Sequence, residues 1–217
     1  WTVFNAERKN WAYRQDQLSS THPIAVDMVD LEAVKTNFDG ITYAKGASVL
    51  QQLVSHVGLE NFTEGLKKYF AKHAWANTTL KDLLVELEAT SGRDLSPWVE
   101  TWLKTSGVNT WRPELTIEGD TYSSIAVKQE APLVPAGSTE LRPHRMAVGL
   151  YDIKGSSVEL RKTVELDVAG ASTIVTELAG EKVADLVVLN DRDLSYGKLR
   201  FDERSITTLK SHLGSIK

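Results

Sequence analysis

Apolar side chains recur every three or four positions through the first half of the chain, which is the spacing of one helix face. An amphipathic segment opens the chain, from Trp1 to Leu18, and a shorter, less regular one runs from Val26 to Phe38. Four stronger runs follow, from Gly46 to Val57, Phe62 to His73, Leu80 to Ser91 and Ser96 to Leu103. The short connections between these runs predict an α-helical array.

After Asn109 the apolar period changes from that of a helix to 2, the period of a β-strand with one buried face. Gly119 and Asp120 are a tight hairpin signal between two such runs. Residues 130–143 contain three prolines and predict a loop. Further strands are expected at residues 144–152, 157–166, 173–178 and 183–190. About six short strands at this spacing favour a small antiparallel β-sandwich without a parallel β-α-β unit.

The pattern therefore predicts a multidomain α and β protein. We expect residues 1–108 to be the helical part of one domain and residues 109–200 to be the β-sandwich. Residues 201–217 are expected to form a short terminal helix that begins a further helical domain. Trp1 stands where a complete reading frame would have methionine, so the sequence is interpreted as a cut or processed piece of a longer chain.

One stretch of the helical half carries candidate chemistry. Between Phe38 and Leu50, the sequence places Tyr43 between Gly40 and Gly46. Because glycine adopts backbone angles that other residues resist, we expect a glycine turn that directs the Tyr43 ring into a cleft at a helix start. A phenol keeps its proton at neutral pH and can donate a hydrogen bond to an oxygen that gains charge, as acyl-transfer sites require. The alternative is a buried tyrosine bonded to a backbone carbonyl.

This stretch resembles the Tyr-x-Lys-Gly segment of the zinc aminopeptidases of the aminopeptidase N family, and the actinobacterial members in particular. Tyr43, Lys45 and Gly46 stand at the positions of that motif. Upstream, the segment Ser20-Thr21-His22-Pro23-Ile24 is similar to the family's Ser-x-His-Pro-Ile segment. Further matches at the family's spacings are Asn77, Thr78, Thr79, Asp82, Leu83, Ser91, Gly92, Trp102 and Gly107. The remainder of the chain resembles the β-rich domain that follows the catalytic domain in this family.

The resemblance implies the C-terminal part of a thermolysin-like catalytic domain, in which Tyr43 donates to the oxyanion while N-terminal residues are removed from peptides. It also implies a zinc ion held by two histidines and a glutamate, with a second glutamate as general base. The family's His-Glu-x-x-His helix and Gly-x-Met-x-Asn loop are absent from this sequence. We therefore expect Tyr43 as the catalytic residue of this chain and no metal ligand or cofactor-binding residue. The chain alone is expected to be inactive without the N-terminal catalytic portion and the C-terminal domain.

Other polar residues of the helical half have simpler interpretations. His22 has no second histidine at ligand spacing, so we expect a structural hydrogen bond rather than metal binding. Asp82 and Asp94 each stand at a predicted helix start, where a carboxylate caps free backbone amides. Lys45 is expected to be a structural surface charge at the start of a helix.

Composition excludes several classes of protein. The net charge of −4 is divided evenly over the two halves, whereas a nucleic-acid surface needs a basic excess. The chain has no cysteine, which excludes disulfides and thiolate metal sites and fits a reducing, cytoplasmic compartment. No apolar run reaches the roughly 20 residues of a membrane helix. One other class stays open, a non-catalytic interaction module in which the helical array and the sandwich bind a partner.

Overall fold

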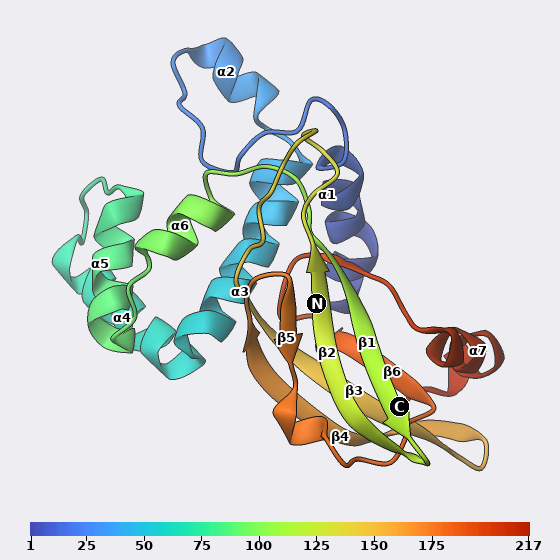
Figure 1. Ribbon diagram of the computed structural model, residues 1–217. Coiled ribbons are helices and arrows are strands. Elements are labelled where there is room, and N and C mark those ends of the chain that lie inside the picture. Colours follow the sequence, from blue (N-terminus) through green and yellow to red (C-terminus); the bar gives the residue numbers. More distant parts are fainter.

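The computed structural model describes residues 1–217 and has a helical part followed by a β part (Figure 1). The first helix begins as a π-helical segment and continues as an α-helix. A second π-helical segment leads directly into helix α3. In chain order the helical elements are η1 (Phe4–Lys9), α1 (Asn10–Gln15), α2 (Leu31–Thr36), η2 (Ile41–Lys45), α3 (Gly46–Val57), α4 (Leu59–Lys72), α5 (Leu80–Ser91) and α6 (Ser96–Trp102). The predicted helical array is confirmed.

Local signals in the sequence set several of these helix ends. Thr79 and Asp82 form a capping box at the start of α5, in which the Thr79 amide donates to Asp82 Oδ2 at 2.7 Å. Asp94 accepts a hydrogen bond from the Ser96 amide at 2.9 Å just before α6, whose first turn contains Pro97. Both aspartates therefore have the structural capping role that the sequence predicts.

The apolar faces of the helices meet in one core, and that core reaches into the C-terminal half of the chain. Leu53, Leu87 and Trp98 are buried together in it. Tyr196 belongs to the same cluster although it follows the last long strand, and its ring stacks on that of Tyr13 with the ring centroids 4.7 Å apart. The helical and β parts are therefore packed against each other through shared buried side chains.

The β part consists of two sheets, as expected for a sandwich. Its elements are β1 (Thr110–Glu118), β2 (Thr121–Glu130), β3 (His144–Lys154), β4 (Ser157–Val168), β5 (Ser172–Ile174), η3 (Thr176–Leu178), β6 (Leu186–Asp191) and β7 (Lys198–Leu199). One sheet has the order β5-β2-β1-β7 and the other the order β4-β3-β6. The antiparallel hairpin of β1 and β2 turns at Gly119 and Asp120, which confirms the prediction for these two residues.

Two strand predictions were wrong in detail. The expected strand at 173–178 is cut short, because β5 ends at Ile174 and a 3-10 turn follows. Val175 and Leu178 are both completely buried, and their spacing of three puts them on the same side of that turn. The expected strand at 183–190 is shifted to β6, and β7 adds a short pairing with β1 that is parallel rather than antiparallel.

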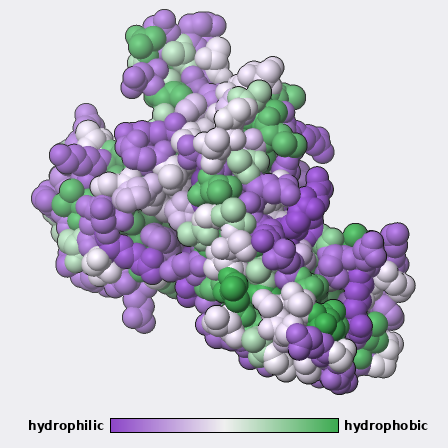
Figure 2. All heavy atoms as spheres, in the orientation of Figure 1, coloured by the Kyte–Doolittle hydropathy of each residue, from purple (hydrophilic) through white to green (hydrophobic).

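The sandwich core and the terminal helix complete the fold. Buried side chains from both sheets, among them Trp111, Val127 and Val148, form the core of the β part. Helix α7 (Glu203–His212) lies beside the sandwich, where the Ser205 hydroxyl accepts a hydrogen bond from the Val187 amide at 2.9 Å (Figure 1). Figure 2 shows mostly polar side chains on the displayed face, with separate apolar spots over both parts. None of the helices has the length and apolar character that crossing a bilayer requires.

Candidate active site

Tyr43 stands in the middle of the π-helical turn η2, immediately before α3. Its side chain is 53% exposed, and no hydrogen bond within the chain engages its hydroxyl. The Phe38 ring contacts the Tyr43 ring edge-on, with 5.6 Å between the ring centroids. The buried tyrosine that the sequence left open as an alternative is thus wrong. A phenol in this position can donate to a bound molecule.

Tyr43 lies between two hollows of the surface. One has a volume of about 390 Å³ and is lined mainly by apolar side chains of α3, α5 and α6, including Leu50, Leu84 and Trp98. The other, of about 340 Å³, is bounded by residues of η1 and α1, among them Trp11. Mainly apolar walls with a few polar groups are typical of ligand-binding sites.

Asp39 satisfies the backbone amides at the start of the Tyr43 turn. Its Oδ1 atom accepts hydrogen bonds from the amides of Ile41 at 2.9 Å and Thr42 at 3.0 Å. Its carbonyl oxygen accepts one from the Tyr43 amide at 3.1 Å. The first amides of a helix have no acceptor inside the helix, so this single residue stabilises the start of η2.

The expected glycine turn around Tyr43 is wrong. Gly40 has φ −65° and Gly46 has φ −54°, both ordinary helical values. Gly40 is needed for a different reason, because a Cβ atom there would lie 3.0 Å from both Gln15 Oε1 and Trp11 Cδ2. The small residue lets η2 approach the end of α1 closely, and this close approach is a property of the tertiary fold.

His22 makes the structural hydrogen bonds that the sequence predicts. Its Nε2 atom lies 2.7 Å from Asp39 Oδ2, and its Nδ1 atom lies 2.7 Å from the carbonyl oxygen of Pro23. The imidazole therefore links the Pro23 carbonyl to the Asp39 carboxylate. The histidine of the His22-Pro23 segment thereby supports the residue that caps the Tyr43 turn.

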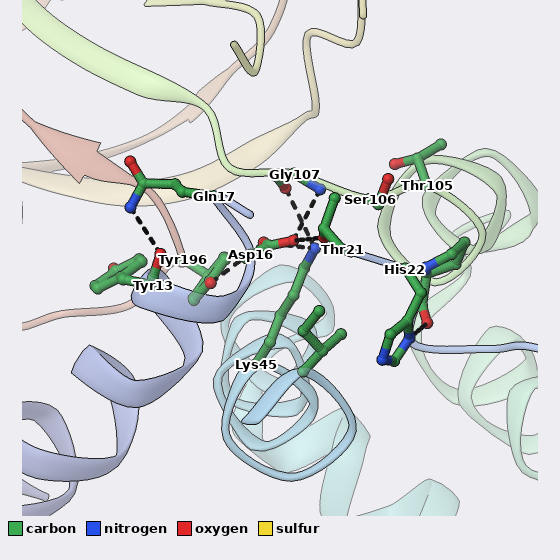
Figure 3. Close-up of polar contacts among 12 residues, drawn as sticks. Tyr13, Asp16, Gln17, Thr21, His22, Lys45, Thr105, Ser106, Gly107 and Tyr196 are labelled. Atoms are coloured by element: carbon green, nitrogen blue, oxygen red, sulfur yellow. Dashed lines mark hydrogen bonds and ion pairs between the residues drawn. The ribbon is translucent and has the colours of Figure 1, made fainter. Parts of the chain in front are cut away.

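Lys45 is not the surface charge that its position at a helix start suggested. It is completely buried and forms an ion pair with Asp16, which is also completely buried, with Nζ 2.8 Å from Oδ2 (Figure 3). Lys45 also donates to the carbonyl of Gly107 at 3.2 Å. Burial lowers the pKa of Lys45 to about 8, while the Asp16 carboxylate opposes that change. The lysine is structural, as expected, but it acts inside the protein.

Asp16 connects this ion pair to the rest of the molecule. It accepts hydrogen bonds from the Thr21 hydroxyl at 2.6 Å, the Gly107 amide at 2.8 Å and the Tyr196 hydroxyl at 3.3 Å (Figure 3). Gly107 has φ +85°, and a Cβ atom there would lie 2.2 Å from the Val134 carbonyl oxygen, so only glycine fits. The turn that carries Tyr43 is therefore fixed at a point where both parts of the fold meet.

Comparisons with known proteins show what this chain is similar to. Residues 1–102 match the family model described as the peptidase family M1 domain. The whole chain is 53% identical over 219 residues to aminopeptidase N of Streptomyces lividans, and the match covers 99% of this chain and 26% of that protein. The first half of the chain is therefore similar to peptidase family M1, and nearly the whole chain is similar to part of an aminopeptidase N.

Other relatives are less similar and match about half of this chain. Tricorn protease-interacting factor F2 of Thermoplasma volcanium is 38% identical over 110 residues, which is 49% of this chain and 14% of that protein. Leucyl aminopeptidase of Saccharolobus solfataricus is 35% identical over 107 residues, with the same share of this chain and 14% of that protein. The chain thus spans about a quarter of the length of its Streptomyces relative and less of the other two.

The residues predicted from the sequence fall into two groups. Tyr43, Lys45 and His22 come together around η2, whereas Asp82 and Asp94 cap helices elsewhere. The sequence did not point to Gln15, Asp16 or Asp39, which hold the turn. The sequence offers one signal for Gln15 and Asp16, which are polar residues at the end of an amphipathic helix. The chain contains no group of three or more His, Asp or Glu side chains that could hold a metal ion.

His144 is a buried titratable group near the junction of the two parts. Its Nδ1 atom lies 2.8 Å from Ser195 Oγ and its Nε2 atom 2.6 Å from Gln129 Oε1, while Trp102 and Trp111 contact its ring edge-on. The amide oxygen accepts only, so Nε2 donates and Nδ1 accepts from the hydroxyl. Burial lowers the pKa of His144 well below its ordinary value, and Arg142 adds to this. The imidazole is therefore neutral.

The neutral His144 predicts a pH dependence of stability. Its folded pKa is depressed, so the unfolded chain binds the proton first, and stability is lost as the pH falls below about 6.5. We expect the free energy of unfolding to decrease by up to about 1.4 kcal/mol per pH unit from this group. Denaturant unfolding at pH 7 and pH 5 measures it. His144→Gln keeps an amide donor and should show a smaller decrease, and an equal decrease in that variant would contradict the assignment to His144.

Proposed function

We propose that this chain is the part of a zinc-dependent aminopeptidase that carries the oxyanion-stabilising tyrosine, Tyr43. The observation that supports it most is the state of that side chain, which is half-exposed, free of internal hydrogen bonds and placed beside an apolar hollow on a turn fixed from several sides. The match to the peptidase family M1 domain and the name of the Streptomyces relative support the reaction class. Kinetics of a Tyr43 variant test the proposal, with the outcome argued in the Discussion.

The proposed chemistry of Tyr43 is hydrogen-bond donation to a carbonyl oxygen that gains negative charge. When water adds to the scissile carbonyl of a peptide, the oxygen becomes an oxyanion and accepts more strongly than the ground-state carbonyl does. A donor already aimed at that position stabilises the transition state more than the bound substrate. The proposed substrate is a peptide with a free N-terminus, and the proposed compartment is the cytoplasm, in keeping with the absence of cysteine.

The remaining catalytic groups are proposed to lie in parts of the full-length relatives that this chain does not span. The histidines and carboxylates present here do not fit a zinc site, since none of them form a cluster. We propose residues 1–108 as the helical part of the catalytic domain, 109–200 as the β domain that follows it, and 201–217 as the start of a helical domain. The partners of this chain are then those other portions of the same protein.

This proposal predicts that the isolated 217-residue chain binds no zinc ion tightly and hydrolyses no aminoacyl anilide. A tight zinc site needs about three or four ligands, and no such set is assembled here. Calorimetric titration of a chelator-washed sample with zinc chloride, together with an anilide assay, measures both. Stoichiometric zinc binding would contradict the proposal. A full-length protein that also lacks activity would instead favour the non-catalytic interaction module.

A further inference from the structure

The end of helix α1 contacts the turn that carries Tyr43 at two consecutive residues. Asp16 pairs with Lys45 at the last position of η2, as described above. Gln15, the neighbouring residue, contacts the other end of the turn. Its Oε1 atom accepts a hydrogen bond from the Gly40 amide at 2.8 Å, and its Nε2 atom donates to Asp39 Oδ2.

Gln15 completes the set of acceptors for the first amides of the Tyr43 turn. Asp39 serves the amides of Ile41, Thr42 and Tyr43, and Gly40 is the one amide left for Gln15. A side chain with both an acceptor and a donor is required here, because it must bind an amide and a carboxylate at the same time. No charged side chain has that combination at neutral pH.

Gln15 also restricts how far the turn can move. The carboxylate that it contacts is the one that caps Ile41 and Thr42, so a shift of Asp39 would displace the start of η2. The Trp11 ring lies against Gly40 from the same helix, at 3.0 Å from where a Cβ atom would be. Tyr43 lies only three residues further on, in a turn too short to absorb such a shift.

We propose that Gln15 is a positioning residue for Tyr43, which fixes the start of the π-helical turn so that the phenol hydroxyl stays aimed at the substrate oxygen. This inference rests on the proposed function of Tyr43. Catalytic donors must be held to a fraction of an ångström, and a displacement of about 1 Å can cost roughly 100-fold in rate. Gln15 itself touches no substrate and acts through Asp39 and Gly40.

The test is a double-mutant cycle in a protein of the relatives' full length that contains this segment. Gln15→Met keeps the length of the side chain and removes both hydrogen bonds. We expect it to lower kcat by about 10- to 100-fold with KM changed less than about twofold. In a Tyr43→Phe background the same substitution should lower kcat by less than about twofold, since the hydroxyl that it positions is already absent.

Gln51→Met is the matched control for this cycle. Gln51 is a half-buried glutamine of α3 whose side chain makes no hydrogen bond, and its replacement should leave kcat unchanged. An equal loss from Gln15→Met in both Tyr43 backgrounds, or no loss in either, would overturn the positioning role. If Tyr43→Phe alone leaves kcat unchanged, the proposed function itself fails. Failure of the proposed function is thus measured with Tyr43→Phe, and failure of the positioning role with Gln15→Met.

A second variant and a second measurement keep the proposal testable even if Gln15→Met misfolds. Asp39→Asn keeps the shape of the cap and places an amide group that opposes Gln15 Nε2, so it should show the same dependence on the Tyr43 hydroxyl. In the 217-residue chain, hydrogen exchange of the amides of residues 40–43 should be faster in Gln15→Met than in Gln51→Met, with exchange at Leu53 unchanged. Equal exchange at residues 40–43 in the two variants would contradict the contact that the proposal needs.

Discussion

Replacing Tyr43 by phenylalanine in a full-length protein that contains this segment is expected to lower kcat by about 100- to 1,000-fold, with KM changed little. The substitution keeps the ring and its contact with Phe38 and removes only the hydroxyl, which no hydrogen bond in the chain engages. An interaction that forms mainly in the transition state raises kcat without tightening substrate binding, so its loss appears in kcat. Steady-state kinetics with an aminoacyl anilide measures the effect.

A melting curve on the same Tyr43→Phe sample separates this role from a structural one. The free hydroxyl predicts an unchanged melting temperature, whereas a structural hydrogen bond would contribute about 1 kcal/mol to stability. Tyr69→Phe is a suitable control, because the Tyr69 hydroxyl bonds to the Thr78 hydroxyl on the distant α4–α5 connection. That variant should keep normal kcat. Near-normal turnover of Tyr43→Phe with a lowered melting temperature would defeat the catalytic assignment.

The elements with strong local signals could be predicted from the sequence. The cap at Thr79 and Asp82, the proline at the start of α6 and the hairpin at Gly119 and Asp120 each depend on residues close together in the chain. Helix α3 and the strands β3 and β4 follow from apolar periods alone. For these segments the local preference and the tertiary fold agree, so a pattern is sufficient.

The details that were predicted wrongly depend on partners far away in the sequence. Gly40 was interpreted through its own backbone angles, but it is needed because Trp11 and Gln15 pack against it. Strand β5 ends early because Val175 and Leu178 are buried in the core. Strand β7, near the end of the sequence of the β part, pairs with β1 at its beginning. No window of neighbouring residues contains these contacts.

Only some residues of the candidate site could be predicted from the sequence. Tyr43 and His22 were found because motifs resembling a known family surround them, and His22 was assigned its structural role from the lack of a second ligand. Asp16 carries no such mark, yet it contacts residues 29 positions later at Lys45 and 180 positions later at Tyr196. A lysine at a helix start is usually solvated, so its burial could not be inferred without its partner.

Removal of the Lys45 charge is expected to destabilise this chain strongly. Lys45→Met keeps most of the side-chain volume but leaves the Asp16 carboxylate buried without a counter-ion. Removing one partner of a buried ion pair costs about 3–5 kcal/mol, because the remaining charge keeps its desolvation penalty. Denaturant unfolding at pH 7 measures the free energy. Lys104→Met, which removes an exposed lysine paired with Glu100, should cost less than about 1 kcal/mol.

A second substitution, at Asp16, tells whether lost charge pairing or lost packing causes the destabilisation of Lys45→Met. Asp16→Asn combined with Lys45→Met removes both charges, while the amide oxygen can still accept from the Gly107 amide and the Thr21 hydroxyl. We expect the double variant to regain most of the lost free energy, since neutral replacements of a buried pair are often tolerated. A double variant as unstable as Lys45→Met would show that the ion pair is not what holds the Tyr43 turn between the two parts of the fold.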